Sequence, residues 1–286
     1  MASVSIGVPV FNGAATLRES LECLRTQTFQ DIEVVISDNC STDGSAEIAE
    51  EFSRADPRFR LVRQAGNVGA KNNFRLLIDE ATSDLFMWRS DDDLSSSDFV
   101  ERLKRLMDGD ASVAMAAPKT VFVRSNGDIS GTYEHVPSGG MCRSMRIGRQ
   151  LLTASPTWIY GLWRRDVLRA SMDRMNEGFP YLWGWDPITL FPVLLDGTVA
   201  VEAGAVLFKR DFPAQRYTSR VPARQMIEMR RAFRRSCFKE FNRRKWCPLD
   251  RCILSVYVLR FSNLRVYRFW KTARAWMREM LGIARR

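Results

Sequence analysis

The chain has 286 residues, which is enough for one large domain or two small ones. Hydrophobic residues make up 45% of it and charged residues 27%, a composition that excludes a disordered or fibrous protein. The formal net charge is +10 but is unevenly spread, since residues 215–286 hold 20 Lys and Arg against 4 Asp and Glu, whereas residues 1–214 hold 23 against 29.

This charge asymmetry predicts a mildly acidic domain over residues 1–214 and a basic, helical C-terminal extension over residues 215–286. The six cysteines are scattered without a C-x-x-C pair, and His135 is the only histidine, so a zinc site of the usual Cys/His spacing is excluded. The N-terminus leads directly into the apolar run 4–8, which does not resemble a secretory signal peptide. We therefore expect reduced thiols and a cytoplasmic location.

Short apolar runs and helical periodicities alternate over the first ninety residues. The apolar runs predict strands over 4–10, 32–36, 59–62 and 85–88. Apolar residues at helical spacing lie between them, for example Leu17, Leu21 and Leu24. This alternation predicts an α/β fold with a Rossmann-like, mostly parallel central sheet flanked by helices.

Polar residues follow each of these strands: Phe11-Asn12, Asp38-Asn39, Asn67 and the triplet Asp91-Asp92-Asp93. Ligands of parallel α/β sheets bind beyond the carboxyl ends of the strands, so these residues are expected around one crevice. No G-x-G-x-x-G, no P-loop and no G-x-S-x-G is present. The crevice offers carboxylates and amides instead.

The acidic triplet admits two interpretations. Three adjacent carboxylates repel one another unless a cation or several donors hold them. Clustered oxygen ligands suit Mg²⁺ or Mn²⁺, so the triplet could bind a metal that carries a diphosphate. Alternatively, it is a solvated turn that caps the helix expected to begin near Ser97.

The residues from 113 to 208 predict further elements: a strand pair over 113–123 broken at Pro118, a loop over 125–144, a short helix around Leu151, a strand turning into a helix over 158–166, an apolar helix over 188–195 and a final strand pair over 197–208. His135 lies in the predicted loop. A solvated histidine is expected there rather than a catalytic one.

The basic extension interleaves Arg doublets with Phe and Trp. Its longest uncharged run, 252–259, is far shorter than the roughly 20 residues of a transmembrane helix. Arginines with aromatic residues on helices suit an anionic membrane surface, reached here from the inner face. A helical extension packed on the preceding domain explains the composition equally well, and nucleic-acid binding is the weakest of the three alternatives.

Four motifs in order resemble the inverting family 2 glycosyltransferases with the GT-A fold: Val8–Asn12, Ser37–Gly44, Asn67–Gly69 with Asn73-Phe74, and Ser90–Leu94. The later segments 161–165 and 185–186 are also similar to that family, and the resemblance covers residues 3–212. It implies transfer of a sugar from a nucleotide-diphospho-sugar, a UDP-sugar above all, to a saccharide or lipid-linked saccharide in polysaccharide or glycoconjugate synthesis. A non-catalytic module that binds nucleotides or anionic surfaces on the same scaffold is the alternative, and metal-dependent nucleotide binding separates the two.

The resemblance also implies roles for individual residues. The donor-binding set is Pro9, Val10, Phe11, Asn12, Asp38, Asn39, Asn67, Asn73, Asp91 and Asp92. The implied ligands of a Mn²⁺ or Mg²⁺ ion are Asp91, Asp92 and Asp93. Asp186 matches the aspartate that removes a proton from the acceptor hydroxyl, and the sequence also admits it as the N-cap of a helix at Pro187, a role that is compatible with the first. Glu134, Asp173 and Glu177 are the alternative bases.

The sequence departs from the family at two places. Ser90 stands where the first Asp of D-x-D-D would be, which leaves open whether Asp92 or Asp93 is the principal metal ligand. Phe212 occupies the place where many members have a histidine near the diphosphate. The cations that could neutralise a diphosphate instead are Lys209, Arg210 and Arg216.

Overall fold

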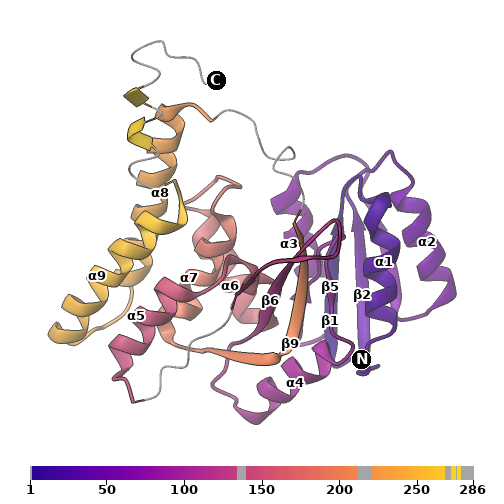
Figure 1. Ribbon diagram of the computed structural model, residues 1–286, viewed down its shortest axis with the longest axis horizontal. Coiled ribbons are helices and arrows are strands. Elements are labelled where there is room, and N and C mark those ends of the chain that lie inside the picture. The colour runs from indigo at the N-terminus through magenta and orange to yellow at the C-terminus, as the bar shows by residue number, and fades with distance from the viewer. Residues whose placement is uncertain (1, 134–139, 212–220, 268–271, 275, 278–286) are drawn as a thin grey trace. The chain divides into compact units, whose positions relative to one another are not determined.

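The computed structural model describes residues 2–133, 140–211, 221–267, 272–274 and 276–277 (Figure 1). It divides into two compact units. The sheet unit comprises 1–135, 157–170 and 198–212, and the helical unit comprises 136–156, 171–197 and 213–286. The boundary expected between 214 and 215 lies outside the described residues, as do Glu134, His135, Phe212 and Arg216.

The sheet unit is built on one mixed sheet. Its strands, within the described residues, are β1 Val4–Val10, β2 Ile32–Asp38, β3 Phe59–Arg63, β4 Leu85–Trp88, β5 Leu94–Ser95, β6 Met115–Arg124, β7 Ile129–Tyr133, β8 Leu162–Arg164 and β9 Val199–Asp211. The order along the sheet is β3-β2-β1-β4-β8-β6-β9-β5, and β7 pairs with β6. The first four strands are mutually parallel, as the sequence predicts. Their carboxyl ends therefore lie at one edge.

Two predicted strand pairs are single strands. Segments 113–123 and 197–208 correspond to β6 and β9, which pair with each other in parallel. The register of the pair shifts between Pro118 and Lys119. Proline has no N–H to donate to the ladder, so its position in the strand is accommodated as a local irregularity and not as the end of the strand.

The loop predicted over 125–144 contains a further strand. Residues 129–133 form β7, which makes an antiparallel hairpin with β6. Gly127 turns the chain at φ +88°, a value that glycine adopts without strain. The Asn126-Gly127 pair is a hairpin signal that the composition of the segment concealed.

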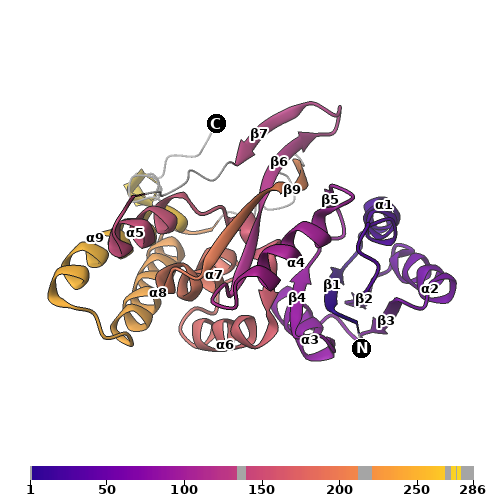
Figure 2. The same ribbon diagram turned by 90° about the horizontal axis from the view of Figure 1, so that it is seen from below.

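Helices cover both faces of the parallel strands: α1 Ala14–Arg25, α2 Ser45–Ala55, α3 Ala70–Glu80 and α4 Phe99–Gly109. The core on one face joins α1, α2 and α4 to alternate residues of β1 from Val4 to Val10. On the other face α3 packs close to β1. A Cβ added at Gly7 would lie only 2.8 Å from Cβ of Leu77, so only glycine allows this approach. Figure 2 shows α1 and α4 on one side of these strands and α3 on the other.

The segment 158–166 turns from strand to helix as predicted, but the strand begins only at Leu162. A short 3₁₀ turn over Pro156–Tyr160 leads into β8, and α6 Arg165–Asn176 follows directly. The helical unit contains α5 Arg143–Thr153, α7 Trp185–Asp196, α8 Ala223–Asn242 and α9 Pro248–Arg265. Rings of α7, α8 and α9 form its core, with centroids of Phe191 and Phe261 5.2 Å apart and those of Phe233 and Phe261 5.8 Å apart. In this unit the extension packs on α5 and α7.

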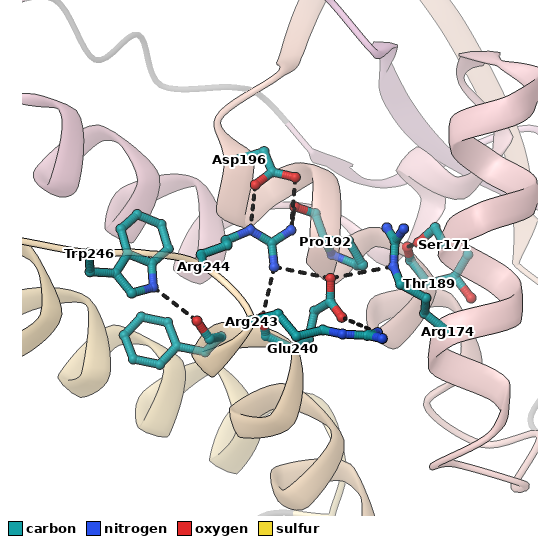
Figure 3. Close-up of polar contacts among 10 residues, drawn as sticks. Ser171, Arg174, Thr189, Pro192, Asp196, Glu240, Arg243, Arg244 and Trp246 are labelled. Carbon is teal, nitrogen blue, oxygen red and sulfur yellow. Dashed lines mark hydrogen bonds and ion pairs between the residues drawn. The ribbon is translucent and has the colours of Figure 1, made fainter.

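An ionic cluster around the buried carboxylate of Glu240 ties α8 to α7 (Figure 3). The Arg244 guanidinium, just past the end of α8, donates to both carboxylate oxygens of Asp196 and at 3.0 Å to Oε1 of Glu240. Glu240 is only 4% exposed, and Arg174 and Arg243 also lie within ion-pair distance of it. Part of the positive charge of the extension is therefore neutralised inside the fold. Among the helices of the described residues, none is long and apolar enough to cross a membrane.

Candidate functional site

The loops that follow β1 and β2 are joined by hydrogen bonds. Asn12, in the left-handed region at φ +53°, donates its N–H to Oγ of Ser41 at 2.9 Å and accepts the N–H of Thr42 on its Oδ1 at 2.9 Å. The N–H of Gly13, the N-cap residue of α1, donates to Oγ of Ser45 at 2.9 Å. Both loops are therefore held in one fixed arrangement at the carboxyl edge of the sheet.

Asp38 is the last residue of β2, and only one oxygen of its buried carboxylate accepts a hydrogen bond from the described residues. It is 1% exposed, and its Oδ1 accepts the N–H of Ser41 at 3.2 Å. Its Oδ2 has no hydrogen-bond partner among the described residues, and the nearest cation, Nε of Arg63, lies 4.0 Å away. A buried oxygen of this kind costs free energy unless a donor reaches it. The half-exposed ring of Phe11 at the same edge provides an aromatic surface for stacking.

Asn39 and Asn67 connect the β2 loop to the segment before α3. Nδ2 of Asn39 donates to Oδ1 of Asn67 at 3.0 Å, and Oδ1 of Asn39 accepts the N–H of Val68 at 2.9 Å. Asn73 is 2% exposed and braces α3 against β2 through two bonds with Ser37. These three amides connect the loops at this edge of the sheet through hydrogen bonds within the chain.

The acidic triplet divides into two outer carboxylates and an inner one. Asp91 and Asp92 are partly exposed, and Asp93 is completely buried. Oδ2 of Asp91 lies against Gly13, where an added Cβ would be only 2.0 Å away. Oγ of Ser90 donates to Oδ1 of Asp92 at 2.6 Å. Two motifs that are far apart in the sequence thus meet at the start of α1.

The triplet does not cap the following helix. The N-cap of α4 is Asp98, and β5 separates the triplet from it. The alternative of a helix-capping acidic turn is therefore wrong.

Asp93 forms an ion pair with Lys209 of β9. Nζ of Lys209 donates to Oδ2 of Asp93 at 2.8 Å and lies 4.9 Å from the ring centroid of Tyr160. Burial opposes the positive charge, but the interactions with Tyr160 and Asp93 outweigh it and raise the pKa of Lys209. Lys209, which the sequence offered as a partner of the diphosphate, is directed at the triplet itself.

Arg89, directly before the triplet, is a buried cation that the sequence analysis overlooked. It is 1% exposed, its Nη2 donates to Oγ of Ser95 at 2.7 Å, and its guanidinium lies 5.1 Å from the ring centroid of Phe99. Its Nε and Nη1 have no hydrogen-bond partner among the described residues. Burial lowers its pKa, and the nearby carboxylate of Asp93 opposes this effect only in part. The sequence does contain a sign of this buried cation, since Arg89 directly continues the apolar run 85–88.

Lys71 is a second cation that was overlooked, in the first turn of α3 behind the Asn67 segment. Burial lowers its pKa to about 8. A lysine with this pKa is mostly charged at pH 7 and loses its charge within about two pH units above it. Perturbed titration of this kind is common at functional sites.

Asp186 lies in the helical unit, in the first turn of α7. The N-cap of α7 is Gly184 at φ +89°, so Asp186 is not the N-cap and the helix begins before Pro187. An added Cβ at Gly184 would lie 2.8 Å from Cγ2 of Val266, which explains glycine there. Of the two tryptophans beside Asp186, Trp185 is buried and Trp183 is half exposed.

The outer pair of the triplet fits a divalent cation that is shared with a phosphate ligand. Among the described residues there is no group of three or more Asp, Glu, His or Cys placed to hold a metal alone. Asp91 and Asp92 offer carboxylates at the open side, and Mg²⁺ typically takes one or two carboxylates together with phosphate oxygens.

Comparison with known proteins agrees with this architecture. The sequence model described as Glycosyl transferase family 2 matches residues 5–159. Glycosyltransferase GlyG of Streptococcus pneumoniae serotype 4 (strain ATCC BAA-334 / TIGR4) is 31% identical over 113 residues, 39% of this chain and 38% of GlyG. The chain spans less than half of the length of the curated relatives that it matches first.

Two solved structures share the fold at low sequence identity. S. aureus TarS 1-349 in complex with UDP has a TM-score of 0.65 at 17% identity, over 90% of this chain and 71% of TarS 1-349. The same fragment is known with UDP-GlcNAc. The mannosyltransferase PcManGT of Pyrobaculum calidifontis, in complex with GDP-Man and Mn²⁺, has a TM-score of 0.60 at 17% identity over 100% of this chain and 76% of its own.

The structural likeness confirms the expected GT-A fold. The family match covers more than half of the chain and includes β1, β2 and the acidic triplet. The chain therefore belongs to glycosyl transferase family 2.

Proposed function

We propose that the chain transfers a sugar, with inversion, from a nucleotide-diphospho-sugar to a saccharide or lipid-linked saccharide, and that a UDP-sugar is the donor. One observation carries the proposal. Oδ2 of Asp38, which accepts no hydrogen bond from the described residues, and the outer carboxylates of Asp91 and Asp92 follow two strands, β2 and β4, whose carboxyl ends lie at one edge of the sheet. Solved structures of similar fold are named with UDP, UDP-GlcNAc and GDP-Man, which supports this class of donor.

The donor base is assigned to the segment 9–12 and to Asp38. Oδ2 of Asp38 accepts an N–H of the base, and the ring of Phe11 stacks on it. Asn39, Asn67 and Asn73 hold the surrounding loops at the correct spacing, because each of them is already hydrogen-bonded within the chain.

A divalent cation, Mn²⁺ or Mg²⁺, is assigned to Asp91 and Asp92, with Asp92 as the principal ligand. Asp93 is the inner support of this turn, since its carboxylate is buried against Lys209. When bound, the cation neutralises the negative charge that develops on the leaving nucleotide diphosphate. The contact with Gly13 fixes the Asp91 carboxylate at the start of α1.

The reaction itself is a single displacement. An acceptor hydroxyl oxygen forms a bond to the anomeric carbon, the bond from that carbon to the diphosphate oxygen breaks, and the nucleotide diphosphate leaves with the electron pair. Asp186 accepts the hydroxyl proton. General-base assistance of this kind is typically worth about 100-fold to 10,000-fold in rate.

The basic extension, residues 215–286, is assigned to an anionic membrane surface that also holds a lipid-linked acceptor. Its excess of positive charge and its interleaved aromatic residues support this assignment. The protein would then act as a peripheral membrane enzyme in polysaccharide or glycoconjugate synthesis.

Calorimetry with UDP and GDP, each with and without Mn²⁺, tests the proposal. We expect UDP to bind more tightly with Mn²⁺ than without it, and Asp92→Asn to remove the difference. Absence of metal-dependent binding of either nucleotide would contradict transfer chemistry and favour a non-catalytic binding module on the same scaffold. A panel of UDP-sugars with mass-spectrometric detection of UDP release then identifies the sugar.

A further inference from the structure

Arg89 connects the two ends of the acidic turn. Its backbone N–H, directly after β4, donates to the carbonyl oxygen of Gly7 in β1 at 2.9 Å. Its Nη2 donates to Oγ of Ser95 in β5 at 2.7 Å. Residues 90–94 lie between these two attachment points, so the arginine spans the segment that carries the acidic triplet.

Helix α1 holds the same turn at both ends. Oγ of Ser20 donates to the carbonyl oxygen of Ser90 at 3.0 Å. At the other end, the N–H of Ser95 donates to Sγ of Cys23 at 3.3 Å. The outer carboxylates of the triplet are therefore carried by a short segment whose two ends are fixed by a helix and bridged by one side chain.

Stability alone does not account for an arginine at this position. Arg89 is 1% exposed, and its Nε and Nη1 have no hydrogen-bond partner among the described residues. A buried charge with unused donors costs free energy, and an apolar side chain of similar volume would avoid that cost. The guanidinium therefore points to a role other than filling the core.

The charge of Arg89 acts on the inner aspartate of the triplet. Arg89 and Asp93 attract each other electrostatically inside the sheet unit. Lys209 donates to Oδ2 of Asp93, whereas Oδ1 accepts no hydrogen bond from the described residues. Asp93 is thus held by one cation of β9 and by a second cation that directly follows β4.

We infer that Arg89 is a positioning residue for the metal and diphosphate site. Its bridge to Ser95 and its attraction for Asp93 fix the acidic turn from within. The fixed turn presents the outer carboxylates, Asp91 and Asp92, at a constant spacing to a divalent cation. Loss of a residue that holds metal ligands in position typically weakens metal binding by about 10-fold to 100-fold. The inference rests on the proposed function, which assigns the metal to these two carboxylates.

The test is calorimetry of UDP binding to the full-length protein, with and without Mn²⁺. Arg89→Met keeps the apolar volume of the side chain and removes its charge and its donors. The ratio of the affinity with Mn²⁺ to the affinity without it should fall by about 10-fold or more, because only the metal ligands lose their position. Affinity for UDP alone should stay within a few-fold of the wild type, since the residues assigned to the base are unchanged.

Arg164→Met is the matched control. Arg164 is a partly buried arginine of the same unit, and its Nε donates to the carbonyl oxygen of Val113 in place of the acidic turn. The affinity ratio of this variant should equal that of the wild type.

Two milder variants keep the test decisive if Arg89→Met does not fold. Ser95→Ala removes the acceptor of the bridge and should lower the affinity ratio several-fold. Arg89→Lys retains a charged donor at the same position and should keep more of the ratio than Arg89→Met. A wild-type ratio in Ser95→Ala would overturn the inference.

A purely structural role predicts a different result. The affinities with and without Mn²⁺ would then fall together in Arg89→Met, and urea denaturation would show a lower free energy of unfolding, which would overturn the inference. A wild-type affinity ratio in Arg89→Met would overturn it as well and leave the proposed function intact. Absence of any effect of Mn²⁺ in the wild type would contradict both.

Discussion

The ammonium of Lys209 donates to Oδ2 of Asp93 at 2.8 Å, which joins β9 to the acidic turn after β4. Asp93 is completely buried, whereas Asp91 and Asp92 remain accessible. Three adjacent aspartates therefore have different environments, because only Asp93 is buried in an ion pair. One carboxylate anchors the turn from inside, and two remain for a ligand.

This division predicts opposite phenotypes for neighbouring substitutions. Asp93→Asn leaves the Lys209 ammonium without its counter-charge, and breaking a buried pair typically costs about 3 kcal/mol or more of the free energy of unfolding. Asp92→Asn should leave the free energy of unfolding almost unchanged and abolish Mn²⁺-dependent UDP binding. Urea denaturation and calorimetry measure the two quantities. A stable Asp93→Asn protein that has lost only metal binding would identify Asp93 as a ligand.

The double variant Asp93→Asn/Lys209→Met provides the control. It removes both charges, so it should recover a substantial part of the stability that Asp93→Asn loses. If the double variant instead lost as much stability as Asp93→Asn and Lys209→Met lose together, the two residues would not interact.

Gly13 is expected to determine where the Asp91 carboxylate lies. An added Cβ would be 2.0 Å from Oδ2 of Asp91, so Gly13→Ala must displace that carboxylate. We expect weaker Mn²⁺-dependent UDP binding by about 10-fold or more, because a metal ligand loses its position. Gly109→Ala is the matched control, since a Cβ there meets nothing within 4 Å. Equal nucleotide affinity in the two variants would contradict the role of this contact.

Much of the sheet unit could be predicted from the sequence because its signals are local. The strands β1, β2, β3 and β4 begin and end within a residue or two of the apolar runs, and the runs of β1, β2 and β4 are largely buried. The order of β6, β8 and β9 could not be predicted, because it depends on pairing between segments that are distant in the chain. Pro118 misled the prediction in the same way, as a bulge and a strand end look alike in the sequence.

The candidate site was predictable as a set of residues but not as a set of contacts. Motif spacing brought Asp38 and the acidic triplet to one edge of the sheet. The pairing of Asp93 with Lys209 joins residues 116 positions apart and leaves no local trace. The start of α7 was misplaced because Gly184, not Asp186, is its N-cap, and the need for glycine arises from a contact with Val266.

Lys71 lies in the first turn of α3, directly after the Asn67 segment, and we propose that its ammonium pairs with the nucleotide diphosphate. Donor binding should then depend on pH. Its pKa is about 8, so its ammonium is charged at pH 7 and largely neutral at pH 9. Affinity for UDP should therefore fall by several-fold between these values, and Lys71→Gln should remove the dependence. Stability should change in the opposite direction, because the folded pKa lies below the unfolded value of 10.5 and the unfolded chain binds more protons between pH 8 and 10.5. Calorimetry measures the UDP affinity and urea denaturation the free energy of unfolding from pH 7 to 9. A wild-type UDP affinity that does not change with pH would place Lys71 away from the diphosphate.

The proposed mechanism depends on Asp186 as the general base. It lies in the first turn of α7, outside the strands that carry the donor residues, and it does not serve as the N-cap of that helix. A sugar hydroxyl is a poor nucleophile until a carboxylate accepts its proton, whereas the amide of Asp186→Asn keeps the shape and cannot take a proton. The variant should bind Mn²⁺ and UDP like the wild type while turnover falls by at least about 100-fold.

Asp173→Asn and Glu177→Gln are the controls, because both residues are exposed in the same unit and were the alternative bases. Each should retain turnover within a few-fold of the wild type. Turnover is measured at saturating donor and acceptor, so that a loss reports the chemical step and not weaker binding. Survival of turnover in Asp186→Asn would move the role of base to another carboxylate. Collapse of UDP binding in that variant would instead make Asp186 a donor ligand.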